Sequence, residues 1–299
     1  MRLTFWGTRG SIATPGKETT RYGGNTPCTE VRLRNNDLII LDAGTGIRNL
    51  GEQLLQDGNP IKAYLLISHP HWDHIQGFPF FRPALIAGNE FTIVGAESEK
   101  LNLQNMITDQ MNKIYFPLQM NDLRAKLNFQ RVTEENEINV FGAKIQILYV
   151  NHPSFALGYR INENGKSIVY ISDNEPFDPE LASRFHNVDR KIVEKYMQSD
   201  GDPNQRIYDF VRGADILIHD STYTPDEYNE RQGWGHSHYL FTLKIAAVGK
   251  VKKLILFHHD PSHTDDDVDA IYSQCKAEMK KNHYTFECVA ATEGMVLET

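Results

Sequence analysis

Short apolar runs separated by turn residues dominate the pattern of hydrophobic and polar positions in this chain. Runs of four to eight residues bounded by Gly, Pro, Asn or Asp are typical of buried strands. They predict strands at 2–6, 28–33, 37–41, 63–67, 91–94, 128–132, 144–150, 156–161, 167–171, 214–218 and 254–257. Helical spacing predicts helices over about 47–56 and 240–248, and in part over 97–128. This order of elements predicts a mixed α/β (α+β) architecture with two sheets.

A dense group of potential metal ligands follows the run at 63–67. The segment is Ser68-His69-Pro70-His71-Trp72-Asp73-His74, and its proline removes a backbone donor and so ends the strand. Histidine nitrogens and aspartate oxygens are ligands for zinc and similar divalent metals. A polar surface loop with chance histidines is the alternative interpretation. The number and spacing of the four ligand-type residues favour a metal site.

Three more ligand-type residues follow apolar runs in the second half of the chain. They are His152, Asp173 and His258, and each stands where a predicted strand ends. Taken singly, each would more often be an ordinary residue at a strand end. With the first cluster they make five His and two Asp, which is more than one tetrahedral zinc ion takes. The set suits two metal ions, which together can activate a water and hold a phosphoryl oxygen.

Composition sets broad limits on the class of protein. The chain has 299 residues, of which 40% are hydrophobic and 23% charged, as in an ordinary globular protein. A formal net charge of -8 argues against a general nucleic-acid binder. No run of 18 apolar residues occurs, so no transmembrane helix is expected. Three cysteines without a CxxC pair argue against a disulfide framework and favour a reducing cytoplasm.

The pattern His-x-His-x-Asp-His at 69–74 resembles the metallo-β-lactamase superfamily, and more closely its ribonuclease Z-like phosphodiesterase branch. The resemblance extends from Met1 to about His263. It implies a four-layer αββα sandwich forming a single domain, 1–299, with a helical insertion at about 97–128. It further implies two Zn²⁺ ions, Mn²⁺ being the alternative, with Asp173 bridging both. The other implied ligands are His69, His71 and His152 for the first ion, and Asp73, His74 and His258 for the second.

The resemblance also covers groups beside the metals. Asp42, in a glycine-rich turn, matches a residue beneath the metal site and is expected to orient the ligands. Asp220 and His236 match an acid and a Gly-His-Ser histidine of ribonuclease Z-like enzymes, although Asp220 replaces Glu and His238 replaces Thr. His236 suits a proton donor or charged stabiliser at the leaving oxygen; the alternative is a cap on the following helix. Asp73 is expected to orient or deprotonate the attacking water as well.

Substrate size is predicted from one interval of the chain. Ribonuclease Z holds transfer RNA with an arm inserted between the ligands that match His152 and Asp173. Only twenty residues separate them here, and a hairpin turning at 162–165 fills the space. The resemblance therefore favours cyclic phosphodiesterases of the branch, which include phage enzymes that destroy cyclic nucleotide immune signals. Four aromatic residues near the site would stack on a base or pack at the rim: Trp72, Phe78, Trp234 and Tyr239.

Several alternatives remain open from the sequence. A ribonuclease Z-like endoribonuclease acting on RNA would need a basic groove. A β-lactamase or other acyl hydrolase would share the histidine cluster but leave the Gly-His-Ser turn without a use. A metal-supported binding module would hold ligands without turnover. A homodimer is expected from the resemblance and from the apolar stretch 101–120, whereas a stable nucleic-acid partner and a membrane are not expected.

Overall fold

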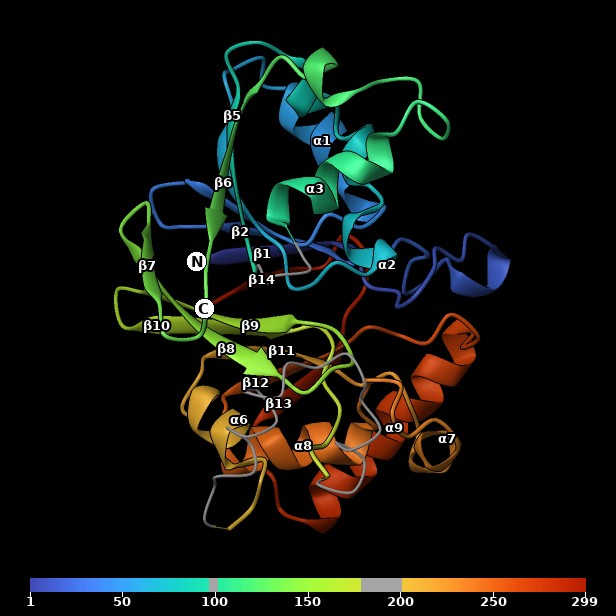
Figure 1. Cartoon of the computed structure of the whole chain (residues 1–299). Helices are drawn as coiled ribbons and strands as arrows, with labels where there is room; N and C mark the ends of the chain where they lie inside the picture. Colours follow the sequence, from blue (N-terminus) through green and yellow to red (C-terminus); the bar gives the residue numbers. More distant parts are fainter. Residues whose placement is uncertain (97–101, 179–200) are drawn as a thin grey trace.

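Two sheets lie face to face in the computed structural model, with helices on both outer surfaces (Figure 1). The structure describes residues 1–96, 102–178 and 201–299. Among these the α-helices are α1 (Gly46–Leu55), α2 (Trp72–Ile75), α3 (Leu103–Thr108), α6 (Gln205–Phe210), α7 (Pro225–Glu230), α8 (Tyr239–Val248) and α9 (Asp265–Lys281). Helices α1 and α3 cover one sheet, and α6, α8 and α9 cover the other. The predicted four-layer αββα sandwich is confirmed.

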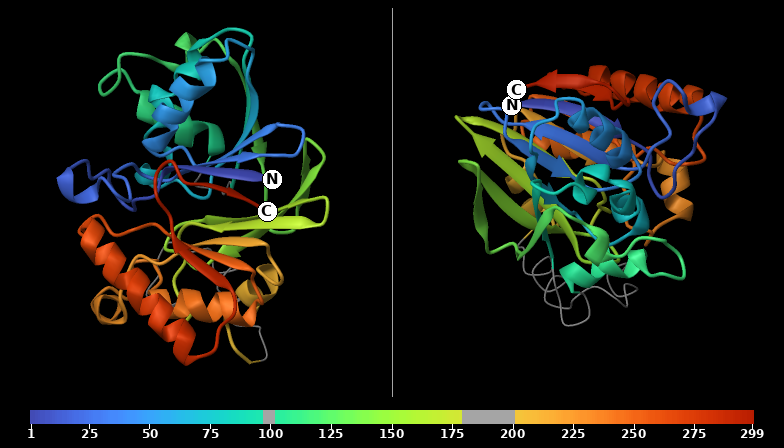
Figure 2. Two further views of the ribbon diagram at one scale, coloured as in Figure 1. Left: turned by 180° about the vertical axis from the view of Figure 1, so that it is seen from behind. Right: turned by 90° about the horizontal axis from the view of Figure 1, so that it is seen from above.

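The first sheet contains the N-terminal strands together with the last one. Its order is β14-β1-β2-β3-β4-β5-β6, and β3 to β6 run parallel. The strands are β1 (Arg2–Gly7), β2 (Cys28–Arg32), β3 (Leu38–Leu41), β4 (Lys62–Leu66), β5 (Glu90–Gly95), β6 (Lys126–Arg131) and β14 (Val296–Glu298). Since β14 pairs with β1, the two chain termini lie side by side at one edge, as both views in Figure 2 show.

The second sheet has the order β13-β12-β11-β10-β9-β8-β7. Its strands are β7 (Glu137–Val140), β8 (Ala143–Val150), β9 (Ala156–Glu163), β10 (Lys166–Ile171), β11 (Ile216–Asp220), β12 (Lys253–Phe257) and β13 (Glu287–Ala290). Strands β10 to β13 are parallel, and β9 is antiparallel to β10. Asn164 and Gly165 join β9 to β10 with φ of 50° and 75°, which is the left-handed backbone that a two-residue hairpin requires. The hairpin predicted there is confirmed.

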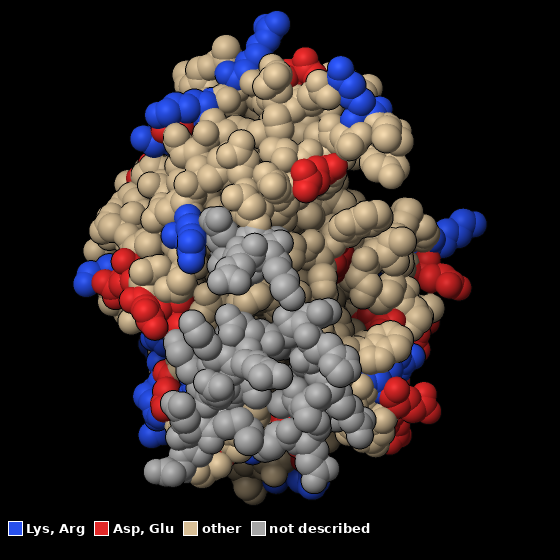
Figure 3. All heavy atoms as spheres, viewed as in Figure 1, with Lys and Arg blue, Asp and Glu red and all other residues tan. Residues whose placement is uncertain are grey.

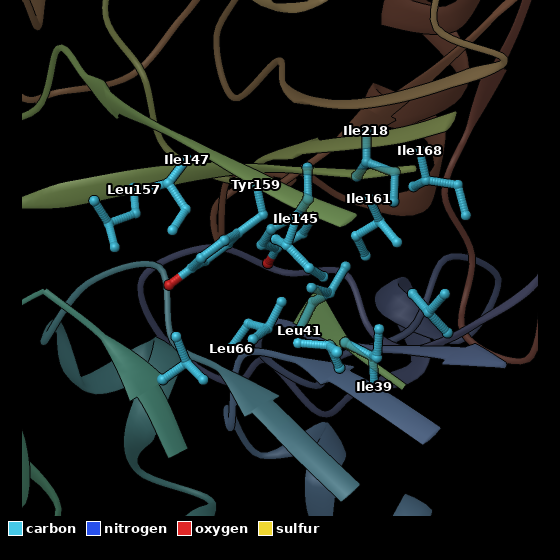
Figure 4. Packing of buried hydrophobic residues seen from close by; sticks show 14 of the residues in the cluster. Ile39, Leu41, Leu66, Ile145, Ile147, Leu157, Tyr159, Ile161, Ile168 and Ile218 are labelled. Atoms are coloured by element: carbon cyan, nitrogen blue, oxygen red, sulfur yellow. The ribbon is translucent and has the colours of Figure 1, made fainter. Parts of the chain in front are cut away.

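Apolar side chains fill the space between the sheets (Figure 4). Leu41 and Leu66 of the first sheet face Ile145, Tyr159 and Ile161 of the second, and all five are at most 1% exposed. Burying one such side chain fully stabilises the fold by about 1.5–3 kcal/mol. The Tyr159 hydroxyl donates to the carbonyl of residue 67 at 2.7 Å, so the one polar atom of this ring is satisfied. This core holds the strand ends, and hence the loops that follow them, in fixed relative positions.

The stretch 97–128 combines a core-covering helix with exposed apolar residues. Its first apolar residue at helical spacing, residue 101, lies outside the described residues. Leu103 and Ile107 of α3 are buried against the first sheet, whereas Ile114 and Tyr115 are each 80% exposed. Residues 126–128 belong to β6, which pairs with β5, so the end of the expected insertion is part of the sheet.

Helix α8 is apolar on nearly all sides because it packs between the second sheet and α9. It has 10 residues, about half of what a hydrocarbon core requires. Within the described ranges, no helix combines enough length with enough apolar character to cross a membrane.

Candidate metal centre

The predicted ligands gather at one edge of the sandwich because each follows the carboxyl end of a strand. The loop 68–74 leaves β4, and His152, Asp173 and His258 follow β8, β10 and β12. Strands β8, β10 and β12 all point the same way in the second sheet, so their ends share an edge. The tight packing of the two sheets brings that edge against the loop after β4.

Three histidines form the first group. The ring of His69 lies 4.5 Å from that of His71 and 4.6 Å from that of His152, between centroids. Nε2 of His152 lies 3.1 Å from Nδ1 of His71. One ligand atom from each, with one from Asp173, all lie within 4.8 Å of one another. This spacing places four donors around a single point.

The second group lies on the other side of the Asp173 carboxylate. Nε2 of His74 is 3.1 Å from Oδ2 of Asp73 and 3.1 Å from Oδ1 of Asp173. Nε2 of His258 is 3.2 Å from Asp73 and 3.4 Å from Asp173. Nε2 of His69, in the first group, is 3.6 Å from the same Asp173 carboxylate. Asp173 therefore stands between the two groups, where a bridging ligand would be.

The donor atoms in both groups fit divalent cations. Nε2 of His69, Nε2 of His74 and Oδ1 of Asp173 are buried without a partner in hydrogen-bonding geometry, which is unusual for buried polar atoms. Nδ1–H of His74 donates to Asp42, which leaves its Nε2 facing the carboxylates of Asp73 and Asp173. Nδ1–H of His152 likewise donates to the Gly235 carbonyl at 2.9 Å. Facing lone pairs repel one another unless a cation lies between them.

Burial favours the neutral ligand form of His71 and His152, whereas at His74 burial is outweighed by the carboxylates of Asp73, Asp173 and Asp42, which raise the imidazole pKa well above its ordinary value. Desolvation lowers the pKa of His152 to about 3 and lowers that of His71 below its ordinary value, so both imidazoles are neutral. The carboxyl pKa of Asp173 would be raised by burial, but the nearby histidines hold it well below its ordinary value. Neutral imidazole and ionised carboxylate are the forms that bind metal.

Asp42 holds the ligand loop from beneath, as predicted. It is fully buried, and its carboxylate accepts hydrogen bonds from Ser68 N–H at 2.7 Å, Ser68 Oγ at 2.8 Å, and Tyr170 Oη and His74 Nδ1 at 2.7 Å each. Its φ is +60°, a backbone conformation that a non-glycine residue adopts only when its surroundings impose it. These bonds fix the tautomer and orientation of His74.

Replacing Asp42 by alanine should weaken both the fold and metal binding. Four buried donor groups would lose their acceptor, so we expect the free energy of unfolding to fall by about 2–4 kcal/mol and the metal affinity by about 10–100-fold. Chemical denaturation of metal-free protein and a metal titration measure the two effects. The exposed Asp57→Ala variant is the control and should match the wild type. An Asp42→Ala variant with unchanged metal affinity would show that Asp42 does not orient His74.

The loop after β1 contributes contacts that the sequence did not reveal. Ser11 N–H donates to Oδ2 of Asp73 at 2.8 Å. A Cβ at Gly10 would lie 2.2 Å from the ring of His258, so only glycine fits there. Thr222 Oγ1 lies 3.1 Å from Nδ1 of His258, which is held at φ +61°. The turn-rich composition of 7–11 was the one signal, and it does not identify Asp73, 62 positions from Ser11, or the still more distant His258.

Asp220 and His236 form a pair beside the two groups. Nδ1 of His236 donates to Oδ2 of Asp220 at 3.1 Å, and its ring stacks on that of His258 with centroids 4.7 Å apart. Asp220 is fully buried and also accepts from Thr222 and from the backbone of Asn174 and Ser237. Burial would lower the pKa of His236, but Asp220 and the other carboxylates outweigh this and raise it to about 9.

The helix cap is His238 and not His236. Nδ1 of His238 accepts from the N–H of Phe241 at 3.4 Å, and the residue stands at the N-cap of α8. The capping alternative for His236 is therefore wrong. The position of His236 would also allow it to be a metal ligand. One ligand atom from each of Asp173, His236 and His258 lies within 4.8 Å of the other two.

The polar residues after His258 serve the packing of loops. His259 Nε2 donates to the carbonyl of Ala291 at 2.9 Å, and His263 Nε2 lies 2.7 Å from Oε1 of Glu227. The buried Arg9 guanidinium donates to the carbonyls of Asp260 and His263 at 3.1 and 2.7 Å. The Arg9 contacts tie the loop after β1 to the loop after β12, and both loops border the second group, where Ser11 meets Asp73 and Gly10 meets His258.

Comparisons with known proteins agree with this geometry. The model of the Beta-lactamase superfamily domain matches residues 37–204. The chain is 23% identical to a ribonuclease Z of Prochlorococcus marinus over 297 residues, covering 88% of this chain and 89% of that protein. Among solved structures, the metallo-beta-lactamase fold protein YhfI of Bacillus subtilis has a TM-score of 0.68 at 17% identity, covering 100% and 99% of the two chains. Yeast PDE1 has a TM-score of 0.64 at 15% identity, with the same coverage.

Proposed function

Because the chain belongs to the beta-lactamase superfamily, we propose that it is a metal-dependent hydrolase of a small phosphodiester, specifically a cyclic nucleotide. The observation that carries the proposal is the convergence of seven His and Asp side chains with the His236–Asp220 pair beside them. Such an activity would remove cyclic nucleotide signals, including those used in immunity.

Two ions are proposed, with Zn²⁺ preferred for its nitrogen-rich donor set and Mn²⁺ as the alternative. One would be held by His69, His71 and His152 and the other by Asp73, His74 and His258, with Asp173 shared. Bound divalent ions supply an activated water and neutralise charge on the phosphoryl group.

The chain's own residues would move the protons. Asp73, whose Oδ2 is fixed by Ser11 N–H, is placed to orient the attacking water and to accept its proton. His236 keeps Nδ1–H on Asp220, which leaves Nε2–H to face the substrate. Its raised pKa favours the charged form near neutral pH, so it can give a proton to the leaving oxygen as the P–O bond breaks.

The interval between His152 and Asp173 supports a small substrate. It folds entirely into the end of one site loop and the tight β9–β10 hairpin, which offers no long arm for holding RNA. On the face shown in Figure 3, Lys and Arg side chains are scattered, mostly around the margin of the view, and the coloured surface carries no continuous basic groove. A net charge of -8 agrees with this.

The four aromatic residues expected at the rim of the site differ in solvent exposure. Phe78 and Tyr239 are 1% and 8% exposed and belong to the core. Trp72 and Trp234 are 77% and 62% exposed, and each stands within two residues of a histidine of the cluster. We propose these two indoles as the surfaces on which a nucleobase stacks, an interaction worth about 1–3 kcal/mol per base.

Ribonuclease Z-like cleavage of RNA is the second candidate, and the curated relatives named Ribonuclease Z favour it. A binding module without turnover is the third. A measurement of turnover distinguishes the binding module from the two hydrolases. Metal-loaded protein should hydrolyse a cyclic nucleotide. A chelator should stop the reaction, and added Zn²⁺ or Mn²⁺ should restore it. Binding of a cyclic nucleotide without release of the opened nucleotide would support a binding module.

We propose that the protein works in the cytoplasm. Cys28, Cys275 and Cys288 are all free and buried, which suits a reducing compartment.

A homodimer is also proposed, because exposed apolar residues such as Ile114 and Tyr115 mark interaction surfaces when they cluster. Light scattering at micromolar concentration should give about twice the 34.2 kDa of one chain. The double variant Ile114→Glu/Tyr115→Glu should shift the particle towards one chain, whereas Val248→Glu on α8 should not. A wild-type particle of one chain mass would rule out the dimer.

A further inference from the structure

Glu175 is a buried carboxylate that touches the site from outside both metal-binding groups. It is 0% exposed, and it accepts hydrogen bonds from the backbone N–H groups of Gly233 at 2.7 Å and Gly235 at 2.9 Å. The two glycines flank Trp234 and both have left-handed backbones, with φ of 88° and 91°. This is a conformation that glycine adopts without strain. The Glu175 side chain therefore holds both ends of the 233–235 turn. Residues other than glycine would be strained at these two ends.

The turn held by Glu175 carries two groups of the candidate site. The Gly235 carbonyl accepts from Nδ1–H of His152 at 2.9 Å, and a Cβ at Gly235 would lie 2.2 Å from that ring. The next residue is His236, whose ring faces Asp220. A shift of the turn would therefore move the acceptor that orients His152 and the ring of His236 together.

The backbone around Glu175 joins the same loops. Glu175 N–H donates to the Asn151 carbonyl at 2.8 Å, and Asn151 Nδ2 donates back to the Glu175 carbonyl at 3.1 Å. The Asn174 carbonyl accepts from Ser237 Oγ at 2.5 Å. Segment 173–175 thus connects the shared carboxylate of Asp173 to the loops that carry His152 and His236.

Lysine and arginine partners do not explain the burial of this carboxylate. In the ranges that the structure describes, no Lys or Arg lies within ion-pair distance of Glu175. Besides the two glycine N–H groups of the turn, the Tyr228 hydroxyl hydrogen-bonds to Glu175, and the nearby His236 stabilises its charged form. A buried carboxylate is costly unless it is hydrogen-bonded, so its retention here indicates that holding the turn is its role.

We propose that Glu175 is a positioning residue that holds the 233–236 turn, and through it orients His152 and places His236 at the leaving oxygen. The effect on His236 rests on the proposed function, whereas the effect on His152 requires only that the cluster binds metal. In Glu175→Gln an amide NH₂ replaces one carboxylate oxygen. One glycine N–H would then face another donor and lose its hydrogen bond. Zinc affinity should then fall by about 10–100-fold, the range for partners that orient a metal ligand.

The test is a cycle of variants with two readouts. With zinc saturating, kcat for a cyclic nucleotide should fall about 10–100-fold in Glu175→Gln, and the loss for bis(p-nitrophenyl) phosphate should be smaller. Adding Glu175→Gln to His236→Ala should cause little further loss in kcat, because both act on the same group. Glu230→Gln, an exposed residue at the end of the neighbouring helix α7, is the matched control and should leave both readouts unchanged. Glu175→Asp, which keeps the charge but cannot reach both glycines, replaces Glu175→Gln if the latter does not fold.

Each outcome decides the proposal. Unchanged zinc affinity and unchanged kcat would overturn it. Equal losses on both substrates, fully additive with His236→Ala, would also overturn it by showing a general effect on folding. If the wild type hydrolyses no phosphodiester, the proposed function fails, and zinc affinity alone still tests the role of Glu175: a 10–100-fold loss supports it and no loss overturns it.

Discussion

An Asp173→Ala variant should lose most of its metal and nearly all of its activity. The Asp173 carboxylate lies between the two groups, 3.1 Å from His74 and within 3.6 Å of His69 and His258. Without it, no shared anion would hold two cations at close range, and each group would keep only three ligands. We expect at most one retained ion per chain and a fall in kcat of about 10⁴, comparable with removal of a central catalytic group. Elemental analysis and steady-state kinetics on the same preparation measure both.

The matched control is Asp226→Ala, an exposed residue at the start of α7. It should retain two ions and full activity. Asp173→Asn keeps the volume of the side chain and removes its charge, so it separates a loss of charge from a collapse of the site. Two ions retained in Asp173→Ala, with a rate near that of the wild type, would contradict the shared-ligand account.

His236→Ala should separate chemistry from metal binding. Its Nδ1 donates to Asp220 at 3.1 Å, and its Nε2 is proposed to donate a proton to the leaving oxygen. The variant should keep its metals, and kcat for a cyclic nucleotide should fall about 10²–10⁴-fold, the range for a general acid. A leaving group that needs no proton, as in bis(p-nitrophenyl) phosphate, should show a much smaller loss.

The alternative outcomes for His236→Ala are distinct. Loss of one ion would make His236 a ligand with Asp173 and His258, an option that their spacing allows. Equal losses on both substrates would indicate a general disturbance of the site. No loss on either would leave the reaction to the metals and Asp73. His238→Ala, which removes the cap of α8, is the control, and we expect it to lower stability but not to discriminate between leaving groups.

The clustering of the ligand-type residues was predictable because their signals are local. Four ligand-type residues lie within 69–74, and the other three stand directly after apolar runs whose ends share one sheet edge. The αββα layers followed from the order of strands and helices together with the resemblance. The long helix α9 was missed, although Thr264 and Asp267 form a capping box at its start. The short strand β14 was also missed, since three residues carry too little pattern.

The supporting contacts were not predictable because they join residues distant in sequence. Ser11 meets Asp73 across 62 positions, and Glu175 meets Gly233 across 58. No periodicity in either segment indicates such a partner. Exposure of the aromatic residues was not predicted from the sequence either: Phe78 is buried and Trp72 is exposed, although both were expected at the rim of the site. The choice between His236 and His238 as helix cap depended on one hydrogen bond, to Phe241 N–H.

The central claim is that this site hydrolyses a small phosphodiester and not transfer RNA. The most direct measurement compares kcat/KM for 2′,3′- and 3′,5′-cyclic nucleotides with kcat/KM for a precursor transfer RNA, on one zinc-loaded preparation. The account predicts that the best cyclic nucleotide is hydrolysed at least about 10²-fold more efficiently, since each good stacking contact contributes about 1–3 kcal/mol and the described interval between His152 and Asp173 offers no arm for RNA. Efficient removal of the 3′ trailer from the precursor, with little or no opening of any cyclic nucleotide, would contradict it.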